Sequence, residues 1–176
     1  MPEQQPAAFS FPIRIYWEDT DAGGIVFYAN YLKFFERART EWLRSLGIEQ
    51  QALKNQLGGM FVVADTTLRY RKPARLDDEL LVTATLATPS RASLTIYQQA
   101  YLKPTVSSLS KEEHCKQSVS GLQPDTRTLL CEGSIRIGWV NAHTLQPGRI
   151  PAVVLQALNS QTGLPDPLTA SLKSTR

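Results

Sequence analysis

The chain has 176 residues, of which 42% are hydrophobic and 20% are charged, and its formal net charge is +3. This length suits one domain with a buried core, and the charge is too small and too scattered to predict nucleic-acid binding. No apolar run approaches the roughly 18 residues of a membrane-spanning helix. The polar opening MPEQQPAAFSFP also lacks the apolar region of a signal peptide, so we expect a cytoplasmic protein without a membrane span.

The N-terminal third of the chain predicts an arm, a strand and a long helix. Residues 1–10 are polar and contain proline, so we expect a flexible arm. Residues 11–17, FPIRIYW, alternate apolar and polar side chains as a strand does. Between residues 26 and 46 the apolar residues recur at helical spacing, with charged residues on the other face. Gly47 stands where a left-handed C-terminal cap belongs.

The remaining pattern is typical of an antiparallel sheet. A short helix or turn is predicted over residues 49–57, and no second long helix separates the segments that follow. Four of these have strand character: 60–71, 79–88, 92–102 and 128–140. We therefore predict the α+β class, with a curved antiparallel sheet of five to six strands wrapped around the 26–46 helix in one domain, residues 11–150.

Two polar segments lie outside this pattern. Residues 103–127 are rich in serine and without period, so we expect a mobile insertion between two strands. Residues 151–176 lack aromatic side chains and are expected to form a disordered C-terminal tail. With only two cysteines in a reducing compartment, we expect Cys115 to be a loop thiol and Cys131 to be a small core residue.

The fragment YWEDTDAGGIVFYANY, residues 16–31, holds three acids, Glu18, Asp19 and Asp21, directly before two glycines. Charges against apolar sequence are costly unless something uses or satisfies them. The spacing is similar to a calcium loop, but such a loop needs a carboxylate at its twelfth position, where this chain has Asn30. Since His and Cys residues also lack the pairing of a zinc site, we predict no metal.

Two hypotheses remain for the acids. In the first, they only cap the following helix, whose N-terminal dipole stabilises a carboxylate by about 0.3–1 kcal/mol. In the second, one carboxylate activates water or attacks a carbonyl, while a free amide at the helix start stabilises the oxyanion. Gly23 and Gly24 would then let the substrate approach the backbone closely. The residues alone leave both hypotheses open and name no substrate.

A longer block, YWEDTDAGGIVFYANYLKFFERARTEWLRSLGI, carries the patterns D-x-D-x-x-G-[IV]-V and F-[FY]-E-x-A-R. It resembles hotdog-fold acyl-CoA thioesterases of the 4-hydroxybenzoyl-CoA thioesterase type, most of all the branch associated with the bacterial Tol-Pal system. PARLDDEL, residues 73–80, is similar to the family's turn between two sheet strands. The resemblance covers roughly residues 11–102 and 128–150. It implies a hotdog fold, no cofactor, and a homodimer, commonly assembled into a homotetramer, with sites at the subunit boundary.

The resemblance also implies roles for individual residues. The family's catalytic acid corresponds to Asp21, as nucleophile or general base, and its oxyanion amide corresponds to the backbone N–H of Tyr28. The Tol-Pal branch usually has histidine where this chain has Tyr28, which leaves the acyl preference open. The segment that lies near the CoA arm in relatives contains Arg91 and Ser93. Further candidates for the CoA phosphates are the basic residues Arg69, Arg71, Lys72 and Arg75.

These residues predict an enzyme of lipid metabolism that hydrolyses acyl-CoA to a free acid and a thiol. Acyl carrier protein is a second candidate donor, because it presents the same pantetheine arm. One alternative is a non-catalytic acyl-thioester binding protein or scaffold of an envelope or lipid-synthesis complex. Another is hydration or dehydration of an acyl thioester, which normally relies on a His–acid pair. His114 and His143 both lie far from the acidic fragment in sequence, which argues against the latter.

Overall fold

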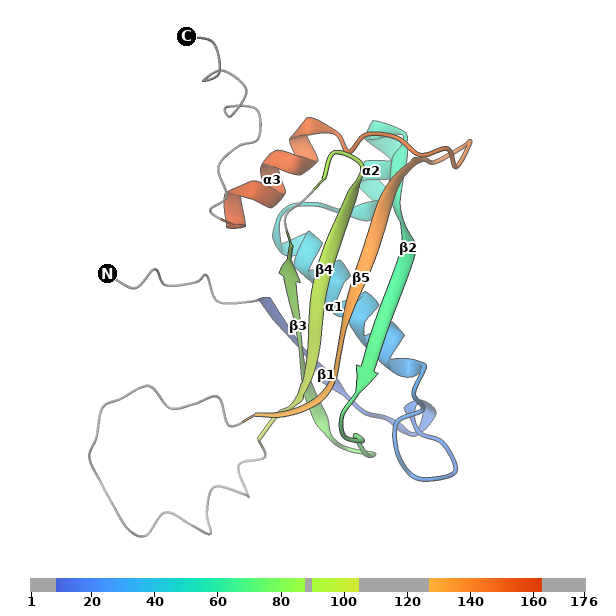
Figure 1. The fold of residues 1–176 in the computed structure, drawn as a ribbon, viewed down its shortest axis with the longest axis vertical. Helices are drawn as coiled ribbons and strands as arrows, with labels where there is room; N and C mark the ends of the chain where they lie inside the picture. The colour runs from blue at the N-terminus through green and yellow to red at the C-terminus, as the bar shows by residue number, and fades with distance from the viewer. Residues whose placement is uncertain (1–8, 88–89, 105–126, 163–176) are drawn as a thin grey trace, which may run out of the picture.

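The computed structural model describes residues 9–87, 90–104 and 127–162. Its strands form one antiparallel sheet in the order β1-β3-β4-β5-β2 (Figure 1). They are β1 (Phe9–Arg14), β2 (Gly59–Tyr70), β3 (Glu79–Leu86), β4 (Ser93–Leu102) and β5 (Thr128–Asn141). The helices are α1 (Asn30–Ser45), α2 (Gln50–Leu57), α3 (Ala152–Thr162) and the short 3-10 helix η1 (Trp17–Asp19). The predicted α+β class is confirmed, and β2 to β5 match the predicted segments within two residues.

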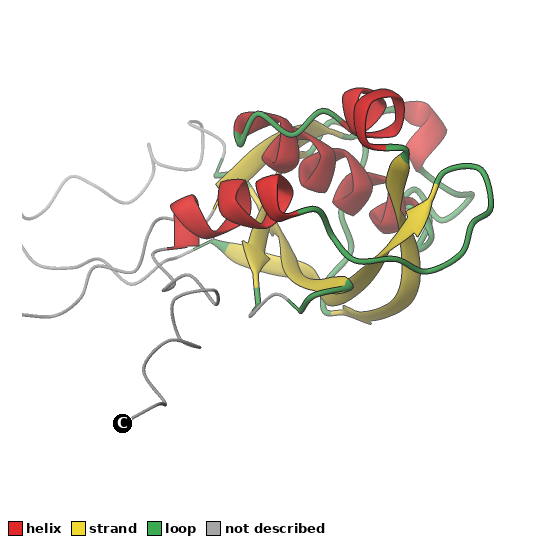
Figure 2. Cartoon of the chain, turned by 90° about the horizontal axis from the view of Figure 1, so that it is seen from above, coloured by secondary structure: helices red, strands yellow, loops and turns green. Residues whose placement is uncertain are grey.

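Helix α1 lies along the concave side of the curved sheet (Figure 2), where it contacts β1 and β3. Its amphipathic sequence explains this placement, because Phe34 and Phe35 are fully buried against the sheet while the charged face remains exposed. On the strands, Leu80 of β3 and Ile96 of β4 complete the same core. Gly47 ends the helix with a φ of +74°, as the sequence predicts.

One polar pair is built into this core and ties α1 to the sheet. Arg39 Nη1 of α1 donates a hydrogen bond to Gln98 Oε1 of β4 at 3.1 Å. Gln98, which is fully buried, uses its Nε2 to donate to the carbonyl of Phe35 at 2.9 Å. Burial lowers the pKa of the Arg39 guanidinium. Because both ends of the Gln98 amide are hydrogen-bonded, its burial is compensated.

The N-terminal strand differs from its prediction. β1 begins at Phe9, inside the predicted arm, and ends at Arg14, so Trp17 does not belong to the strand. Trp17 instead opens η1 and is 77% exposed. The reason lies in the backbone, because the N–H of Ile15 donates to the carbonyl of Asp78 and the chain then turns away from the sheet. Residues 1–8 of the predicted arm lie outside the described residues.

The C-terminal prediction is wrong where the structure places α3. Val154 and Leu158 of this helix are 2% and 0% exposed and belong to the hydrophobic core. Two apolar residues four positions apart, without aromatic neighbours, are too few to predict a helix from sequence. Packing against the rest of the core stabilises α3 instead. The remainder of the predicted tail, and residues 105–126 of the predicted insertion, lie outside the described residues.

Two further observations concern the core and its helices. Cys131 is fully buried, as predicted, and burial raises the pKa of its thiol to about 12. Cys115 lies outside the described residues. Of the helices in the described ranges, none is long and apolar enough to cross a membrane.

Candidate active site

The acidic fragment folds into a short hairpin between β1 and α1. Thr20 pairs with Val26 across its two arms, and the N–H of Asp21 donates to the carbonyl of Ile25 at 2.9 Å. The N–H of Gly24 donates back to the carbonyl of Asp21 at 2.9 Å, which closes the turn. Gly24 has a φ of +70°, a backbone conformation that glycine adopts without steric cost. Asp21 therefore stands at the first position of a tight turn.

The Asp21 side chain is exposed and only partly engaged. Its Oδ1 accepts a hydrogen bond from the Gly23 N–H at 2.8 Å, an arrangement that aspartate favours in turns. A Cβ added to Gly23 would lie 3.1 Å from this oxygen, so glycine is what lets the carboxylate and the backbone come so close. No donor within the described ranges reaches Oδ2 of Asp21. One carboxylate oxygen is thus available for chemistry.

Asp19 has the opposite surroundings, although it is only two residues away. It is 3% exposed, and its Oδ2 accepts a hydrogen bond from the Tyr16 N–H at 3.0 Å. Its carbonyl accepts from the Phe27 N–H at 2.9 Å and from Asn30 Nδ2 at 3.0 Å. Asp19 therefore joins both arms of the hairpin to the start of α1. No acid lies in the first turn of α1, but Asp19 caps the short helix η1 by accepting the Tyr16 N–H. Capping therefore accounts for Asp19 and not for the exposed Asp21.

Tyr28 lies in a turn just before Ala29, the N-cap residue of α1. The helix thus begins at Asn30, later than predicted. The carbonyl of Phe27, in the same peptide group as the Tyr28 N–H, accepts a hydrogen bond from the Asn30 N–H at 2.9 Å. The carbonyl of Tyr28 accepts one from the Tyr70 hydroxyl at 3.2 Å. No acceptor in the described part of the chain takes the Tyr28 N–H itself, so this amide is both oriented and free.

Both arms of the hairpin are anchored to the segment that connects β2 and β3. On the first arm, the Ile15 N–H donates to the carbonyl of Asp78 at 2.9 Å. On the second, the Val26 N–H donates to the carbonyl of Ala74 at 2.9 Å. This connecting segment contains the PARLDDEL sequence, whose place between two strands is as predicted.

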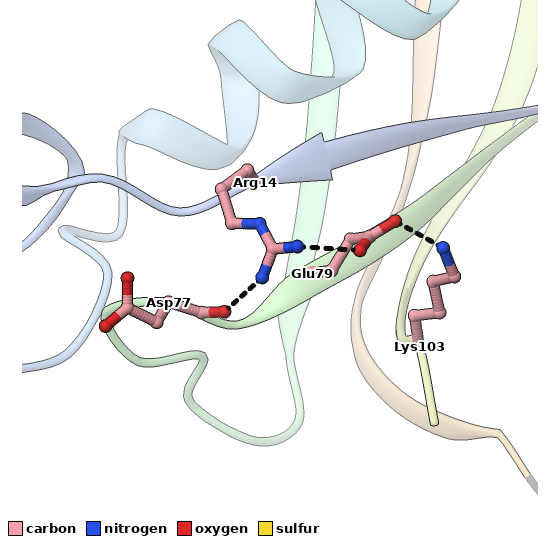
Figure 3. A network of polar contacts seen from close by, with 4 residues as sticks. All are labelled: Arg14, Asp77, Glu79 and Lys103. Atoms are coloured by element: carbon pink, nitrogen blue, oxygen red, sulfur yellow. Dashed lines mark hydrogen bonds and ion pairs between the residues drawn. The ribbon is translucent and has the colours of Figure 1, made fainter. Parts of the chain in front are cut away.

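A polar network holds the base of the hairpin (Figure 3). Arg14 at the end of β1 donates to the Asp77 carbonyl at 2.7 Å and to Glu79 Oε2 at 2.9 Å. Lys103, just after β4, donates to the other oxygen of Glu79. The Lys103 hydrogen bond holds the pKa of the Glu79 carboxyl below its usual range. Because Glu79 opens β3, the network joins three strands at the end of the sheet from which the hairpin leaves.

Aromatic side chains surround the free amide. The ring of Tyr28 contacts those of Phe27 and Tyr70, at centroid distances of 4.6 and 6.2 Å. Tyr28 is 62% exposed, and Trp17 on η1 is also highly exposed. Beneath them, Tyr31 is buried with no hydrogen-bond partner for its hydroxyl among the described residues, and burial raises its pKa to about 12. Trp17 and Tyr28 thus expose aromatic side chains in the same fragment of the chain as Asp21.

The structure does not bring the predicted CoA-binding residues Arg91 and Ser93 to this end of a single chain. Ser93 opens β4 and pairs with Gly138 of β5, whereas Tyr70, which contacts the Tyr28 turn, pairs with Cys131. The seven steps along β5 from Cys131 to Gly138 span roughly 23 Å at the usual rise of a strand. Ser93 also shares a 2.9 Å hydrogen bond with the Ser90 hydroxyl. Within one chain, Arg91 and Ser93 therefore lie far from the turn that carries Tyr28.

The other basic candidates lie nearer to the hairpin. Arg69 is the residue before Tyr70 in β2, and Lys72 and Arg75 follow in the exposed connection to β3. Arg71 is already engaged, because its Nη2 lies 2.6 Å from Glu132 Oε1 of β5. The Arg71 hydrogen bond holds the pKa of the Glu132 carboxyl below its usual range.

A hollow of about 580 Å³ lies elsewhere, on the face of the sheet opposite α1. Its walls include Thr67, Tyr97, Gln99 and Glu132, and Asp21 is not among them. Within the described ranges, no three His, Cys, Asp or Glu side chains gather in a way that could hold a metal ion.

Sequence reasoning missed two residues that the structure places at the site. In the sequence, Tyr70 is one more aromatic residue at the end of a predicted strand, and Asn30 is a polar residue inside an apolar segment. Tyr70 contacts the Tyr28 turn only because β2 and the hairpin come together in space. Asn30 contacts the carbonyl of Asp19 only because the hairpin folds back on the start of α1. A tyrosine directly before the basic turn offers no local signal for such a role.

Comparisons with known proteins agree on one group of relatives. A family model described as the thioesterase-like superfamily matches residues 15–158. The chain is 45% identical over 98 residues to the acyl-CoA thioesterase YbgC of Haemophilus influenzae, a match that covers 56% of this chain and 71% of the relative. It is 30% identical over 147 residues to the acyl-CoA thioesterase YbgC of Helicobacter pylori, covering 84% and 97%. A probable thioesterase from Bartonella henselae superposes with a TM-score of 0.65 at 26% identity, covering 82% of this chain and 100% of that one.

Proposed function

The chain belongs to the thioesterase-like superfamily, and from this premise we propose that it hydrolyses acyl-CoA thioesters with Asp21 as the reacting carboxylate. Its fold is the hotdog fold and its activity is that of an acyl-CoA thioester hydrolase, as the resemblance predicted. The role of Asp21 is supported by one observation above the others. The Asp21 carboxylate is exposed, whereas the neighbouring Asp19 is only 3% exposed.

The proposed reaction adds water across the thioester. As a general base, Asp21 takes a proton from a water molecule that attacks the acyl carbonyl. As a nucleophile, Asp21 attacks the carbonyl itself, and water then hydrolyses the resulting anhydride. In both routes the carbon–sulfur bond breaks, the thiol of CoA leaves with a proton, and the acid is released. The Tyr28 N–H is the proposed donor to the oxyanion, where one such donor contributes about 3 kcal/mol.

The substrate side of the proposal rests on the exposed aromatic surface. Trp17 and Tyr28 are exposed within the same fragment as Asp21, and such aromatic side chains suit an acyl chain or a pantetheine arm. Because acyl carrier protein presents the same arm, we keep it as a second candidate donor. A cytoplasmic location stays a prediction. The alternative of a non-catalytic binding protein has no observation in its favour, since a free carboxylate oxygen is not needed for binding alone.

We further propose a homodimer that pairs through β2. Within the described residues this 12-residue strand pairs on one side only, with β5, and a long unpaired edge strand is a template for another chain. Two β2 strands related by a two-fold axis run antiparallel, so the start of one lies beside the end of the other. Such pairing would bring Arg91 and Ser93 of one subunit toward Asp21 of its partner. A homotetramer stays a prediction.

The test is a pair of matched substitutions assayed for thiol release from a panel of acyl-CoAs. Asp21→Asn removes the charge but keeps an oxygen that can accept the Gly23 N–H, so the turn is retained. We expect kcat to fall by at least about 100-fold, the low end for loss of an acid–base group. Asp19→Asn is the control, because its side chain faces inward to the Tyr16 N–H, and its kcat should fall much less.

Equal activity of Asp21→Asn and the wild type, with any acyl-CoA of the panel, would overturn the assignment of Asp21. Tight binding of acyl-CoA by the wild type without thiol release above buffer would instead support the non-catalytic alternative. The panel also shows whether aliphatic or aromatic acyl groups are preferred, which neither the sequence nor the hairpin geometry defines.

A further inference from the structure

We propose that Tyr70 is a positioning residue of the thioesterase reaction, whose hydroxyl holds the Tyr28 turn so that the Tyr28 N–H points at the oxyanion. This inference rests on the proposed function, because it assigns to Tyr70 an effect on the amide that the proposed reaction uses. Tyr70 belongs to β2 and is separated from Tyr28 by 42 residues, so the contact is tertiary.

The geometry explains why the hydroxyl matters for the amide. Tyr28 lies between two peptide groups, one with the Phe27 carbonyl and the Tyr28 N–H, the other with the Tyr28 carbonyl. The first is held by the Asn30 N–H at 2.9 Å, and the second by the Tyr70 hydroxyl at 3.2 Å. Since Tyr28 precedes the regular helix, the helical ladder does not restrain its dihedral angles. Without Tyr70, one of the two anchors is lost.

Tyr70 is itself well placed to act as an anchor. It is the last residue of β2, and its backbone pairs with Cys131 in the neighbouring strand. Its ring meets those of Tyr28 and Tyr31 edge-on, at centroid distances of 6.2 and 5.8 Å. Partial burial raises the pKa of Tyr70, so the hydroxyl keeps the proton that it donates. The Tyr70 ring therefore packs while its hydroxyl makes the polar contact with the turn.

The expected effect is smaller than the loss of the donor. Removing an oxyanion donor costs about 100- to 1000-fold in kcat, whereas loosening one that remains in place should cost about 3- to 10-fold, the range of one net hydrogen bond. KM should stay within about twofold, because an interaction made only in the transition state affects kcat rather than ground-state binding. A purely structural role would instead lower the unfolding midpoint and leave kcat unchanged.

The experiment compares Tyr70→Phe with Tyr97→Phe in the full chain. Both substitutions remove one hydroxyl from a half-exposed strand tyrosine, but Tyr97 lines the hollow on the other face of the sheet. With the acyl-CoA that the wild type turns over fastest, we expect a lower kcat for Tyr70→Phe only. An S-alkyl-CoA thioether, which has no thioester carbonyl, should bind the wild type and Tyr70→Phe equally.

The remaining outcomes separate this inference from the proposed function. If Tyr70→Phe keeps the wild-type kcat while Asp21→Asn loses activity in the same assay, the inference is overturned and the function stands. If Tyr70→Phe raises KM and weakens thioether binding at unchanged kcat, Tyr70 contacts the substrate and is not a positioning residue. If Asp21→Asn retains full activity, the proposed mechanism fails, and the role of Tyr70 with it.

Discussion

Asp19 and Asp21 show how far two identical side chains can differ within one hairpin. Asp19 is almost completely buried and bonded to Tyr16, whereas Asp21 is exposed with a free oxygen. The sequence motif assigns the reacting acid to Asp21, but the letters D-T-D do not tell which carboxylate faces inward. Burial depends on the carbonyl contacts of Asp19 with Phe27 and Asn30, which only the folded hairpin supplies.

The two glycines of the turn have different physical roles, and substitutions should separate them. Gly24 has a φ of +70°, and a Cβ added to it would meet only open space, so Gly24→Ala introduces backbone strain without a steric clash. We expect it to lower the free energy of unfolding by about 1–2 kcal/mol and to leave kcat nearly unchanged. Urea denaturation followed by tryptophan fluorescence, together with steady-state kinetics, measures both quantities.

Gly23→Ala should instead affect kcat more than the free energy of unfolding. Its Cβ would lie 3.1 Å from Asp21 Oδ1, which would have to give way by a few tenths of an ångström. A shift of about 1 Å in a reacting group can cost 100-fold, so we expect a loss of about 10-fold in kcat. The same kcat for Gly23→Ala and Gly24→Ala would show that the carboxylate position does not depend on this contact.

At the scale of elements, periodicity predicted α1 and the four longest strands because each repeats its pattern over many residues. Buried Tyr31, Phe35 and Ala38 recur at helical spacing in α1. In β5, buried Ile135 and Ile137 alternate with less buried neighbours. The boundaries were less accurate where tertiary contacts end an element. The Ile15–Asp78 hydrogen bond is such a contact, and the turn at Tyr28 delays the start of α1.

Helix α3 was missed although Val154 and Leu158 are buried and Leu155 and Ala157 pack partly against the core, because so short an apolar segment gives a weak periodic signal. Leu158 is fully buried and Val153 is 59% exposed, so the pair offers a matched test of the contribution of α3. We expect Leu158→Ala to lower the free energy of unfolding by about 2–4 kcal/mol through loss of buried area and the cavity left behind. Val153→Ala should change it by less than about 0.5 kcal/mol. Equal effects in urea denaturation would mean that α3 does not pack on the core.

At the scale of the whole molecule, the sequence alone could place Asp21 beside Gly23 and Gly24, but it could not place Arg91 and Ser93 relative to them. Asp21, Gly23 and Gly24 lie within one hairpin, so their order in the chain already places them together. Arg91 and Ser93 are brought to the far end of the sheet by the antiparallel pairing of β4 with β5. Their distance from Asp21 follows from strand topology, which no local motif encodes.

The distance between Arg91 and Asp21 within one chain leads to a prediction that holds only if two subunits form each site together. If Arg91 binds CoA at the Asp21 site of the partner subunit, each site contains Asp21 from one subunit and Arg91 from the other. Asp21→Asn and Arg91→Ala in different subunits of one dimer then affect the same site. A mixed dimer of the two variants has one site with both lesions and one with neither. Random reassociation of equal amounts makes half of the dimers mixed, so about a quarter of all sites should be intact.

The measurement is thiol release at a substrate concentration well below KM, after the two variants are unfolded together in urea and refolded. We expect about a quarter of the wild-type rate from the mixture, well above the mean of the two variants treated separately. A mixture that only averages its components would show that Arg91 does not act at the Asp21 site of the partner subunit. Wild-type protein taken through the same urea cycle controls for recovery of activity. Asp21→Asn mixed with Asp19→Asn is the second control. Because both changes fall in the same hairpin, this mixture should give only the average rate of its two components.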